Sequence, residues 1–218
     1  MIGAVIAMQS EAEILLSEMK IERNLTISGK QVFIGLAYGK PTAVCICGVG
    51  KVNAALGAQI LISKFDVKSL LNFGVAGGLN KTTELCQVYQ ISNAVQFDFD
   101  LVQLNGGKIG TLDEYEENYL KLNLLDLPFE LKKLGTSDRF NDSPADFKLL
   151  TEELEADIRD MEGCAIVQAA LCAKLPVYAL KAISDVAGSG STTEQYLTNR
   201  DKALCNLKAY LPLIFEKI

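Results

Sequence analysis

Acidic side chains are the first candidates for chemistry in this chain, because none of its 218 residues is a histidine. A Ser-His-Asp triad, a Cys-His dyad and a histidine-based zinc motif are therefore excluded together. An enzyme with this sequence, working near neutral pH, must move protons with Asp, Glu, Lys, Tyr or Cys. Acids that follow predicted strands are the strongest candidates, because ligands of open α/β folds bind beyond the carboxyl ends of the strands.

Glu11 follows an apolar segment, residues 2–8, that is predicted to be a strand. This position could bring its carboxylate to a ligand. A structural interpretation competes, because Ser10 and Glu13 have the S-x-x-E spacing of a capping box. Glu11 would then be an acid in the first turn of a helix, where the helix dipole favours it. From these residues alone, the structural interpretation is the stronger one.

Two other acids stand at the boundaries of predicted elements. Asp185 follows Ser184 at the carboxyl end of the apolar segment 177–184. This pair could face a ligand or close the strand with an Asx or ST turn. Glu162 begins an almost wholly apolar helix predicted over 161–174, where an acid without a partner would be costly. Glu162 therefore indicates a ligand hydroxyl or a buried partner.

Two glycine-containing segments could bring a ligand close to the backbone. The G-V-G loop at 48–50 precedes a helix predicted over 51–64, so N–H groups at that helix N-terminus could face a ligand. The pattern is weak evidence for a dinucleotide, and Asp66 precedes the next strand instead of ending it, so NAD binding is not predicted. Residues 72–79 run from a strand into a glycine-rich turn, which fits ligand approach and tight backbone packing equally well.

Strand-like and helical segments alternate along the chain and must position these residues. The predicted strands are residues 2–8, 31–37, 42–47, 69–74, 86–95, 131–137 and 177–184. The predicted helices are residues 9–20, 51–64, 143–153, 161–174 and 193–215. Several strand segments are continuous apolar runs, as expected for strands covered on both faces. This order predicts one α/β domain over residues 1–218, with a central mixed, twisted sheet flanked by helices.

Composition narrows the partners and the compartment. The net charge is -6 and no basic run exists, so a nucleic-acid partner is not expected. No apolar run approaches the roughly 18 residues of a membrane span, and the apolar start lacks the charged region of a signal peptide, so a cytoplasmic protein is predicted. The cysteines lie in apolar stretches without a C-x-x-C pair, which favours buried, reduced thiols. They are Cys45, Cys47, Cys86, Cys164, Cys172 and Cys205.

Six segments, taken in order, resemble the purine nucleoside phosphorylase/nucleosidase superfamily, and most closely its 5'-methylthioadenosine/S-adenosylhomocysteine nucleosidase branch. They are A-M-Q-S-E-A-E at 7–13, C-G-V-G-K-V-N-A-A-L-G-A at 47–58, N-F-G-V-A-G-G-L at 72–79, T-S-D-R-F at 136–140, D-M-E-G at 160–163 and A-I-S-D-V-A at 182–187. Each segment is weak evidence by itself. Six in register over nearly the whole chain are strong evidence.

The resemblance implies roles for residues of these segments. Glu11 would activate the attacking water, and Asp185 would protonate purine N7 or donate a hydrogen bond to it. The implied substrate-binding residues are Val49, Val75, Gly77, Phe140, Asn141, Met161, Glu162 and Ser184. Among these, Glu162 would accept hydrogen bonds from the sugar hydroxyls and Phe140 would stack on the purine. No metal or organic cofactor is implied, and a homodimer is expected because family members are homodimers.

The implied reaction suits these residue types. Cleavage of a ribosyl C1'–N9 bond builds positive charge on the sugar and negative charge on the departing base. An acid at N7 relieves the second problem, and one such proton transfer contributes about 10²–10⁴-fold. A carboxylate near the sugar stabilises the developing cation. A second carboxylate can deprotonate water, as in inverting glycosidases.

Several alternatives stay open. A phosphate nucleophile needs cationic clamps, and no arginine lies in the first two glycine-containing loops, so water is expected to attack. The rivals are a phosphate-dependent phosphorylase, a nucleosidase for another 5'-modified substrate such as aminofutalosine, and a non-catalytic nucleoside-binding protein. Departures from the family pattern include Leu104 for a phenylalanine of the 5' pocket and Lys181 for an arginine, so the 5' group is not predicted.

Overall fold

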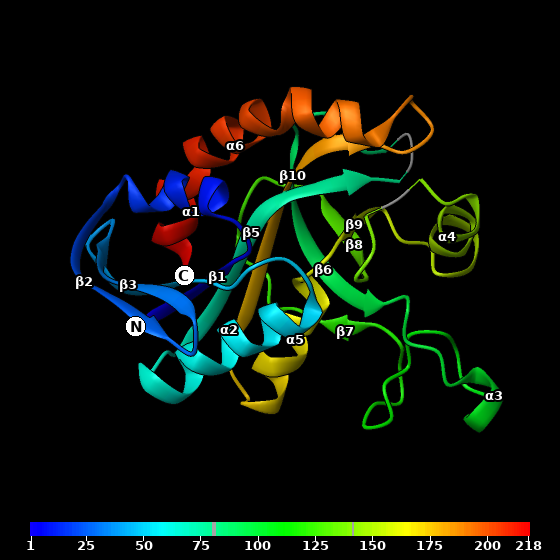
Figure 1. Ribbon diagram of the computed structural model, residues 1–218, viewed down its shortest axis with the longest axis horizontal. Coiled ribbons are helices and arrows are strands. Elements are labelled where there is room, and N and C mark those ends of the chain that lie inside the picture. Colours follow the sequence, from blue (N-terminus) through cyan, green and yellow to red (C-terminus); the bar gives the residue numbers. More distant parts are fainter. Residues whose placement is uncertain (80–81, 141) are drawn as a thin grey trace.

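A mixed, twisted sheet passes through the middle of the molecule, with helices on both faces (Figure 1). The computed structural model describes residues 1–79, 82–140 and 142–218. Its strands are β1 (Ile2–Ile6), β2 (Met19–Ile27), β3 (Lys30–Ala37), β4 (Lys40–Ile46), β5 (Ser69–Gly78), β6 (Val88–Gln96), β7 (Leu120–Lys121), β8 (Leu131–Thr136), β9 (Ile158–Asp160) and β10 (Val177–Val186). Its helices are α1 (Gln9–Leu16), α2 (Lys51–Lys64), α3 (Val102–Asn105), α4 (Pro144–Lys148), the π-helical η1 (Leu149–Glu153), α5 (Gly163–Cys172) and α6 (Thr192–Lys217). The predicted fold class is confirmed.

The strand order brings three carboxyl ends to one edge of the sheet. Strand β1 lies between β4 and β5 and is parallel to both, and β5 is also parallel to β10. Beyond β10 the sheet curls back on itself, because β10 pairs with β6, β6 with β8, β8 with β9, and β9 again with β5. The loops that follow β1, β5 and β10 therefore open on a common space at the rim of this curled part.

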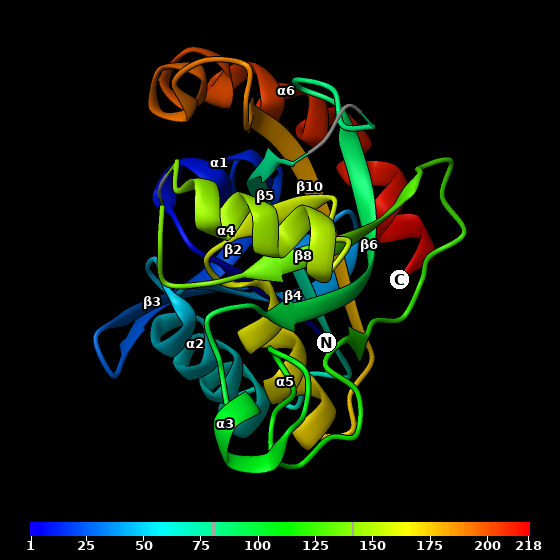
Figure 2. The ribbon, with the colours of Figure 1, turned by 90° about the vertical axis from the view of Figure 1, so that its right-hand side faces the viewer.

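Two hydrophobic cores lie on the two faces of the sheet. Helices α1 and α6 cover one face, and α2 and α5 cover the other (Figures 1 and 2). Successive residues of one strand supply different cores: Leu70 packs on the α2 and α5 side, and Leu71 packs on the α1 and α6 side. This alternation follows from the two-residue repeat of a strand. It explains why β1, β5 and β10 are almost continuously apolar.

Helix α2 begins and ends at the predicted residues, but its apolar side chains do not all face the core. Ile60 and Leu61 are buried, whereas Val52 is 71% exposed and Leu56 is 49% exposed. The helix therefore presents an apolar outer face as well as an apolar inner face.

Other element boundaries differ from the prediction. The first helix ends at Leu16 instead of continuing to residue 20, and β2 starts soon afterwards. Strand β2 reads M-K-I-E-R-N-L-T-I and is mostly exposed, so it lacks the apolar run that marked the other strands. The predicted helix 143–153 is divided into α4 and η1.

The predicted capping box at Ser10 is wrong. The residue that caps α1 is Met8, and no side-chain oxygen of Ser10 takes part. The side chain that returns to the cap backbone belongs to Glu11, which accepts a hydrogen bond from the Met8 N–H.

The cysteine prediction is partly wrong, because Cys172 and Cys205 are exposed while the other cysteines are buried. All six are free thiols. No helix within residues 1–79, 82–140 and 142–218 combines the length and the apolar character needed to cross a membrane.

Candidate active site

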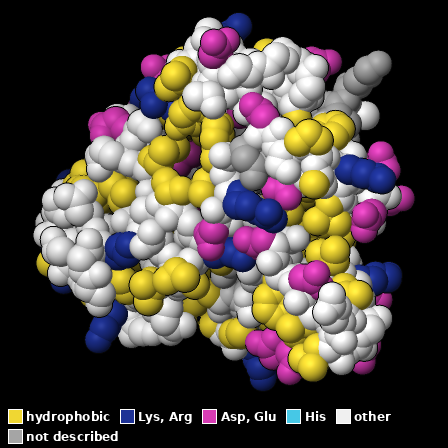
Figure 3. Space-filling view, turned by 45° about the vertical axis from the view of Figure 1, so that its right-hand side comes forward, with side chains coloured by type: hydrophobic (Ala, Val, Ile, Leu, Met, Phe, Trp, Pro, Cys, Tyr) yellow, Lys and Arg dark blue, Asp and Glu magenta, His cyan; other side chains and the backbone are white. Residues whose placement is uncertain are grey.

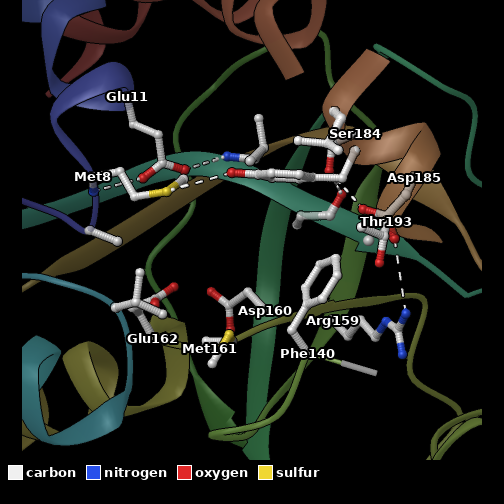
Figure 4. Close-up of a pocket in the computed structure, with 17 residues that line it drawn as sticks. Met8, Glu11, Phe140, Arg159, Asp160, Met161, Glu162, Ser184, Asp185 and Thr193 are labelled. Atoms are coloured by element: carbon white, nitrogen blue, oxygen red, sulfur yellow. Dashed lines mark hydrogen bonds and ion pairs between the residues drawn. The ribbon is translucent and has the colours of Figure 1, made fainter. Parts of the chain in front are cut away.

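A cavity of about 350 Å³ opens where the loops after β1, β5 and β10 meet. It is lined by Ala7, Met8, Glu11, Val49, Val75, Ala76, Gly77, Phe140, Arg159, Asp160, Met161, Glu162, Ser184, Asp185, Thr193, Tyr196 and Leu197. Glu11 and Asp185 lie at opposite sides of this cavity, with Glu162 below Glu11 and Phe140 below Asp185 in the view of Figure 4. The two predicted catalytic acids thus share one cavity, although they come from opposite ends of the chain.

Backbone N–H groups hold the Glu11 carboxylate in place. Its Oε1 accepts a hydrogen bond from the Val75 N–H at 2.9 Å, and its Oε2 accepts one from the Met8 N–H at 3.1 Å. Burial raises the Glu11 pKa, while Lys181 and these two N–H groups act in the opposite direction. One donor lies in β5 and the other at the start of α1, so the two elements together fix the direction of the carboxylate (Figure 4).

Gly74 provides the space in which Glu11 lies. A Cβ atom at this position of β5 would stand 2.3 Å from Glu11 Oε1, far inside van der Waals contact. Glycine at residue 74 is therefore required for the carboxylate to lie flat on the strand and reach the Val75 N–H.

The second acid, Asp185, is 2% exposed and accepts a hydrogen bond from the preceding residue, Ser184. The Ser184 hydroxyl donates a hydrogen bond to Asp185 Oδ1 at 2.8 Å, and Arg159 Nη2 lies 3.9 Å from Asp185 Oδ2. Burial raises the Asp185 pKa, whereas the Ser184 hydrogen bond and the Arg159 charge lower it. The carboxyl group can thus hold a proton at a higher pH than an exposed aspartate would.

Glu162 joins the cavity to the glycine loop before α2. Its Oε1 accepts a hydrogen bond from the Gly50 N–H at 2.9 Å. Burial raises the Glu162 pKa to about 7, and the neighbouring charge of Asp160 adds to this rise. The partner expected for this buried acid is therefore present, and it is a backbone group of a segment that also lines the cavity through Val49.

Phe140 and Tyr196 form one apolar wall of the cavity. Phe140 lies in the loop after β8 and is 50% exposed. Its ring contacts the Tyr196 ring edge-on, with 5.8 Å between the centroids. Tyr196 belongs to α6, and its hydroxyl lies 3.6 Å from Met8 Sδ. A flat ring could pack between this aromatic pair and the opposite wall.

The remaining predicted binding residues lie on the same cavity, with one outside the described residues. Val49, Val75, Gly77 and Met161 are lining residues. Gly77 leaves room for the acid, because a Cβ there would stand 2.8 Å from Asp185 Oδ2. Asn141 lies outside the described residues.

Several lining residues were not predicted. Arg159 and Asp160 belong to the three-residue strand β9, which is too short to give an apolar pattern. Thr193 and Tyr196 lie in the first turns of α6, which was predicted as a helix but not as part of the site. Two signals were available: Asp160 stands in the D-M-E-G segment at 160–163, and Arg159 directly precedes it.

Metal ligands do not gather in the described ranges, where no group of three or more His, Cys, Asp or Glu side chains has a suitable arrangement. The face of the molecule drawn in Figure 3 is mixed in character. In the space-filling view of Figure 3, hydrophobic side chains gather in patches, and charged side chains lie between them.

The fold and the cavity define an α/β protein that places buried carboxylates on both sides of one small-molecule site. Residues 1–215 match the family model described as the phosphorylase superfamily. The chain belongs to this superfamily, and the family predicted from the six segments is confirmed.

Individual proteins that are similar to this chain are nucleosidases. The chain is 29% identical over 213 residues to the 5'-methylthioadenosine/S-adenosylhomocysteine nucleosidase of Marinomonas sp. (strain MWYL1), with 90% of this chain and 91% of that protein covered. It is 25% identical over 212 residues to the aminodeoxyfutalosine nucleosidase of Campylobacter jejuni, with 92% and 93% covered. Among solved structures, the 5'-methylthioadenosine/S-adenosylhomocysteine nucleosidase of Colwellia psychrerythraea 34H, in complex with adenine, superimposes with a TM-score of 0.89 at 24% identity, covering 99% of this chain and 95% of that chain.

Proposed function

We propose that the protein is a nucleosidase that hydrolyses the N-glycosidic bond of 5'-substituted adenosines and releases adenine and the free 5'-substituted ribose. The observation that carries this proposal is the placement of Glu11 and Asp185 on opposite sides of one cavity. The similarity to curated nucleosidases over about nine tenths of the chain supports the same reaction.

Asp185 is the acid that activates the departing purine. Negative charge develops on the base as the C1'–N9 bond breaks, and a proton at N7 neutralises it. Burial favours the protonated form of Asp185, and the Ser184 hydroxyl fixes the orientation of its carboxyl group. Phe140, beside Tyr196, covers the purine ring on this side of the cavity.

Glu162 binds the sugar and stabilises its developing charge. Its Oε1 is bound to the Gly50 N–H, which leaves Oε2 to accept hydrogen bonds from the ribose hydroxyls. A carboxylate bound there places negative charge near the oxocarbenium-like sugar in the transition state. Met161 packs against the sugar, and Val49 lines its 5' side.

Glu11 is the base that activates water. Each of its oxygens accepts one backbone N–H, and a carboxylate has about four lone-pair sites, so acceptor capacity remains for a water molecule. Its position opposite Asp185 lets water approach C1' from the side away from the leaving base. Val75 and Gly77 lie along the path between the two acids.

Water fits the site better than phosphate does, because carboxylates of the chain already occupy the anion-binding end of α2. Asp138 Oδ1 accepts the Lys51 N–H at 2.7 Å, and Glu162 accepts the Gly50 N–H. The Lys51 ammonium is bound to Asp98 at 2.5 Å. A phosphate at this loop would meet three carboxylates and a neutralised lysine instead of a cationic clamp.

Two further features of the protein are part of the proposal. The protein works as a homodimer, and the exposed apolar face of α2 supports this part of the proposal. The cytoplasmic location of the protein stays a prediction from the sequence. The natural 5' substituent is proposed only as a class, methylthio or homocysteinyl, with the aminodeoxyfutalosine side chain as the alternative that the Campylobacter relative favours.

Adenine release measured with and without inorganic phosphate tests the reaction. Methylthioadenosine, S-adenosylhomocysteine and aminodeoxyfutalosine are supplied in parallel, and the sugar product is identified. We expect phosphate-independent release of adenine and a free sugar. Strict dependence on phosphate with a sugar 1-phosphate product would establish a phosphorylase, and no cleavage of any of the three would favour a binding protein.

A further inference from the structure

A buried ion pair lies close to Glu11, one of the two proposed catalytic acids. Lys181 Nζ lies 2.8 Å from Asp160 Oδ2, and the two side chains are 3% and 2% exposed. Such a pair is costly to remove from water unless other groups complete its hydrogen bonds. Because Asp160 also lines the cavity, we ask what this ion pair does for the site.

Asp160 is fixed by groups from three other elements. Its Oδ1 accepts the Thr136 hydroxyl at 2.6 Å, and its Oδ2 accepts the Gly163 N–H at 2.9 Å in addition to the lysine. The carboxylate is thus held by β8, by the start of α5 and by β10. These three contacts fix its orientation, so it provides an anchor for the Lys181 ammonium.

The register of the sheet places Lys181 on the same face as Glu11. Lys181 in β10 is the direct partner of Gly74 in the parallel strand β5. A Cβ built at Gly74 would point at Glu11 Oε1. Partners in register on parallel strands project their side chains to the same face, so the Lys181 side chain leaves the sheet on the face that Glu11 covers.

The groups that face this cluster can be named element by element. Glu11 comes from α1, Asp160 from β9, Glu162 from the turn before α5, and Lys181 from β10. Cys47, after β4, faces Glu162, and Cys164 in α5 faces Asp160. Burial raises the pKa of both cysteines, so both stay neutral thiols. Three buried carboxyl groups therefore share one buried ammonium.

Lys181 keeps its charge in this cluster. Burial acts against that charge, but Asp160 and Glu162 outweigh it and raise the Lys181 pKa. The same ammonium is the main influence that opposes burial at Glu11. Both relations have the direction expected for opposite charges held close together in a low dielectric.

We infer that Lys181, anchored by Asp160, is a positioning residue whose ammonium keeps Glu11 in the carboxylate form that the attack of water requires. This inference rests on the proposed function for its consequence in catalysis. Lys181 is not among the residues that line the cavity, so its effect on the substrate is indirect. It acts through Glu11, and to a smaller degree through Glu162.

Opposite changes of charge separate this role from a purely structural one. Lys181→Met removes the positive charge, so Glu11 ionises at higher pH, and the acid limb of kcat/KM moves up by about one pH unit or more. Asp160→Asn removes a negative charge and leaves Lys181 in place, so the acid limb moves down. Lys181→Arg keeps the charge and leaves the limb where it is. The double variant Lys181→Met with Asp160→Asn returns the limb toward its original position.

The experiment measures kcat/KM for adenine release from pH 4.5 to pH 9 in the five proteins. Shifts of opposite sign in Lys181→Met and Asp160→Asn, with Lys181→Arg unchanged, support the inference. A uniform loss of rate without movement of the limb, or movement in one direction for both, overturns it. If Lys181→Met does not fold, Asp160→Asn and the double variant still decide between these outcomes.

A titration without substrate separates this inference from the proposed function. Protein labelled with ¹³C at the glutamate side-chain carboxyl is titrated by NMR, and the Glu11 signal is assigned with Glu11→Gln. The midpoint should rise in Lys181→Met and fall in Asp160→Asn. If the wild-type protein releases no adenine but the midpoints move in this way, the proposed function fails and the electrostatic role of Lys181 stands. If the enzyme is active but the Glu11 midpoint is the same in the wild-type protein and in both variants, the role of Lys181 is refuted and the proposed function stands.

Discussion

The Glu11 carboxylate accepts backbone N–H groups from two elements, and its remaining lone pairs face the cavity. Replacing it with Gln keeps the shape but removes the base, and the side-chain amide can no longer accept at both ends. We expect Glu11→Gln to lower kcat by at least about 10²-fold while adenine still binds. Adenine binding by calorimetry and turnover by product release measure the two effects.

Glu13→Gln is the matched control for Glu11→Gln, because Glu13 is an exposed acid on the same helix. Its turnover should equal that of the wild-type protein. A wild-type rate in Glu11→Gln would mean that Glu11 serves only the start of α1.

Asp185→Asn tests the acid on the other side of the cavity. An asparagine cannot supply a proton to N7, so we expect a loss of cleavage of about 10²–10⁴-fold, measured as adenine release. Ser184→Ala is the companion variant. Its hydroxyl lowers the Asp185 pKa, so removing it raises that pKa and moves the alkaline limb of activity to higher pH. An alkaline limb that moves to lower pH would contradict the assignment.

Glu162 links the site to the stability of the fold. Its pKa is raised from 4.5 to about 7, so the folded protein binds more protons than the unfolded chain between these values. Between these two pH values, the folded state holds a proton that the unfolded chain has already lost. The free energy of unfolding therefore decreases as the pH rises from about 4.5 to about 7. We expect Glu162→Gln to weaken this fall. The urea midpoints of unfolding at pH 5 and pH 7.5 measure this fall. If the midpoint changes by the same amount between the two pH values in the wild-type protein and in Glu162→Gln, the assignment is refuted.

At the scale of elements, β5 connects the two halves of the site. Gly74 leaves space for Glu11, Val75 holds its carboxylate, and Gly77 leaves space for Asp185. Gly74→Ala would force the Glu11 carboxylate away from the Val75 N–H, since a Cβ there stands 2.3 Å from Oε1. We expect kcat to fall at least about tenfold because a displaced base loses its geometry.

Gly29→Ala tests whether the Gly74 effect is local. Gly29 lies in the β2–β3 turn, away from the cavity residues, with no atom within 4 Å of an added Cβ. Its positive φ of 76° makes the substitution strained there too, so it reports the effect of strain alone on activity. Equal losses of kcat in the two variants would show that the Gly74 effect is not specific to Glu11.

The element scale also shows what a sequence can and cannot reveal. The bounds of α2 were predicted correctly because its helical spacing is long and uninterrupted. Strand β2 was missed because its exposed edge position favours polar residues, and β9 because three residues carry no period. The predicted site therefore began at Met161 and omitted Arg159 and Asp160, although Asp160 stands in the D-M-E-G segment.

The residues that were found show a different limit. Glu11 could not be distinguished from a first-turn acid by its neighbours, because the group that orients it, the Val75 N–H, lies far away in the sequence. The resemblance to a family supplied this long-range information, and the fold brought the predicted residues that the structure describes to one cavity. Lys181 could be noted as a departure from the family pattern, but its partner Asp160 is apparent only in three dimensions.

At the scale of the whole molecule, the outer face of α2 is the feature that a monomer leaves unexplained. Leu56 is 49% exposed and Val52 is 71% exposed, one turn apart on the same face of the helix. Two copies that bury this face against each other would remove apolar surface from water in the isologous manner of a two-fold dimer. We therefore expect Leu56→Glu to place two like charges in the contact and to shift the protein to monomers.

Sedimentation velocity over a range of concentrations measures that shift, with Leu124→Glu as the matched control. Leu124 is also 49% exposed but lies outside α2, so its change adds the same charge to another surface. The wild-type protein and Leu124→Glu should sediment as dimers at concentrations where Leu56→Glu is monomeric. A wild-type protein that is monomeric throughout would refute the homodimer, and a dimer that persists in Leu56→Glu would move the interface to another face, because a buried pair of glutamates at a two-fold contact is strongly unfavourable.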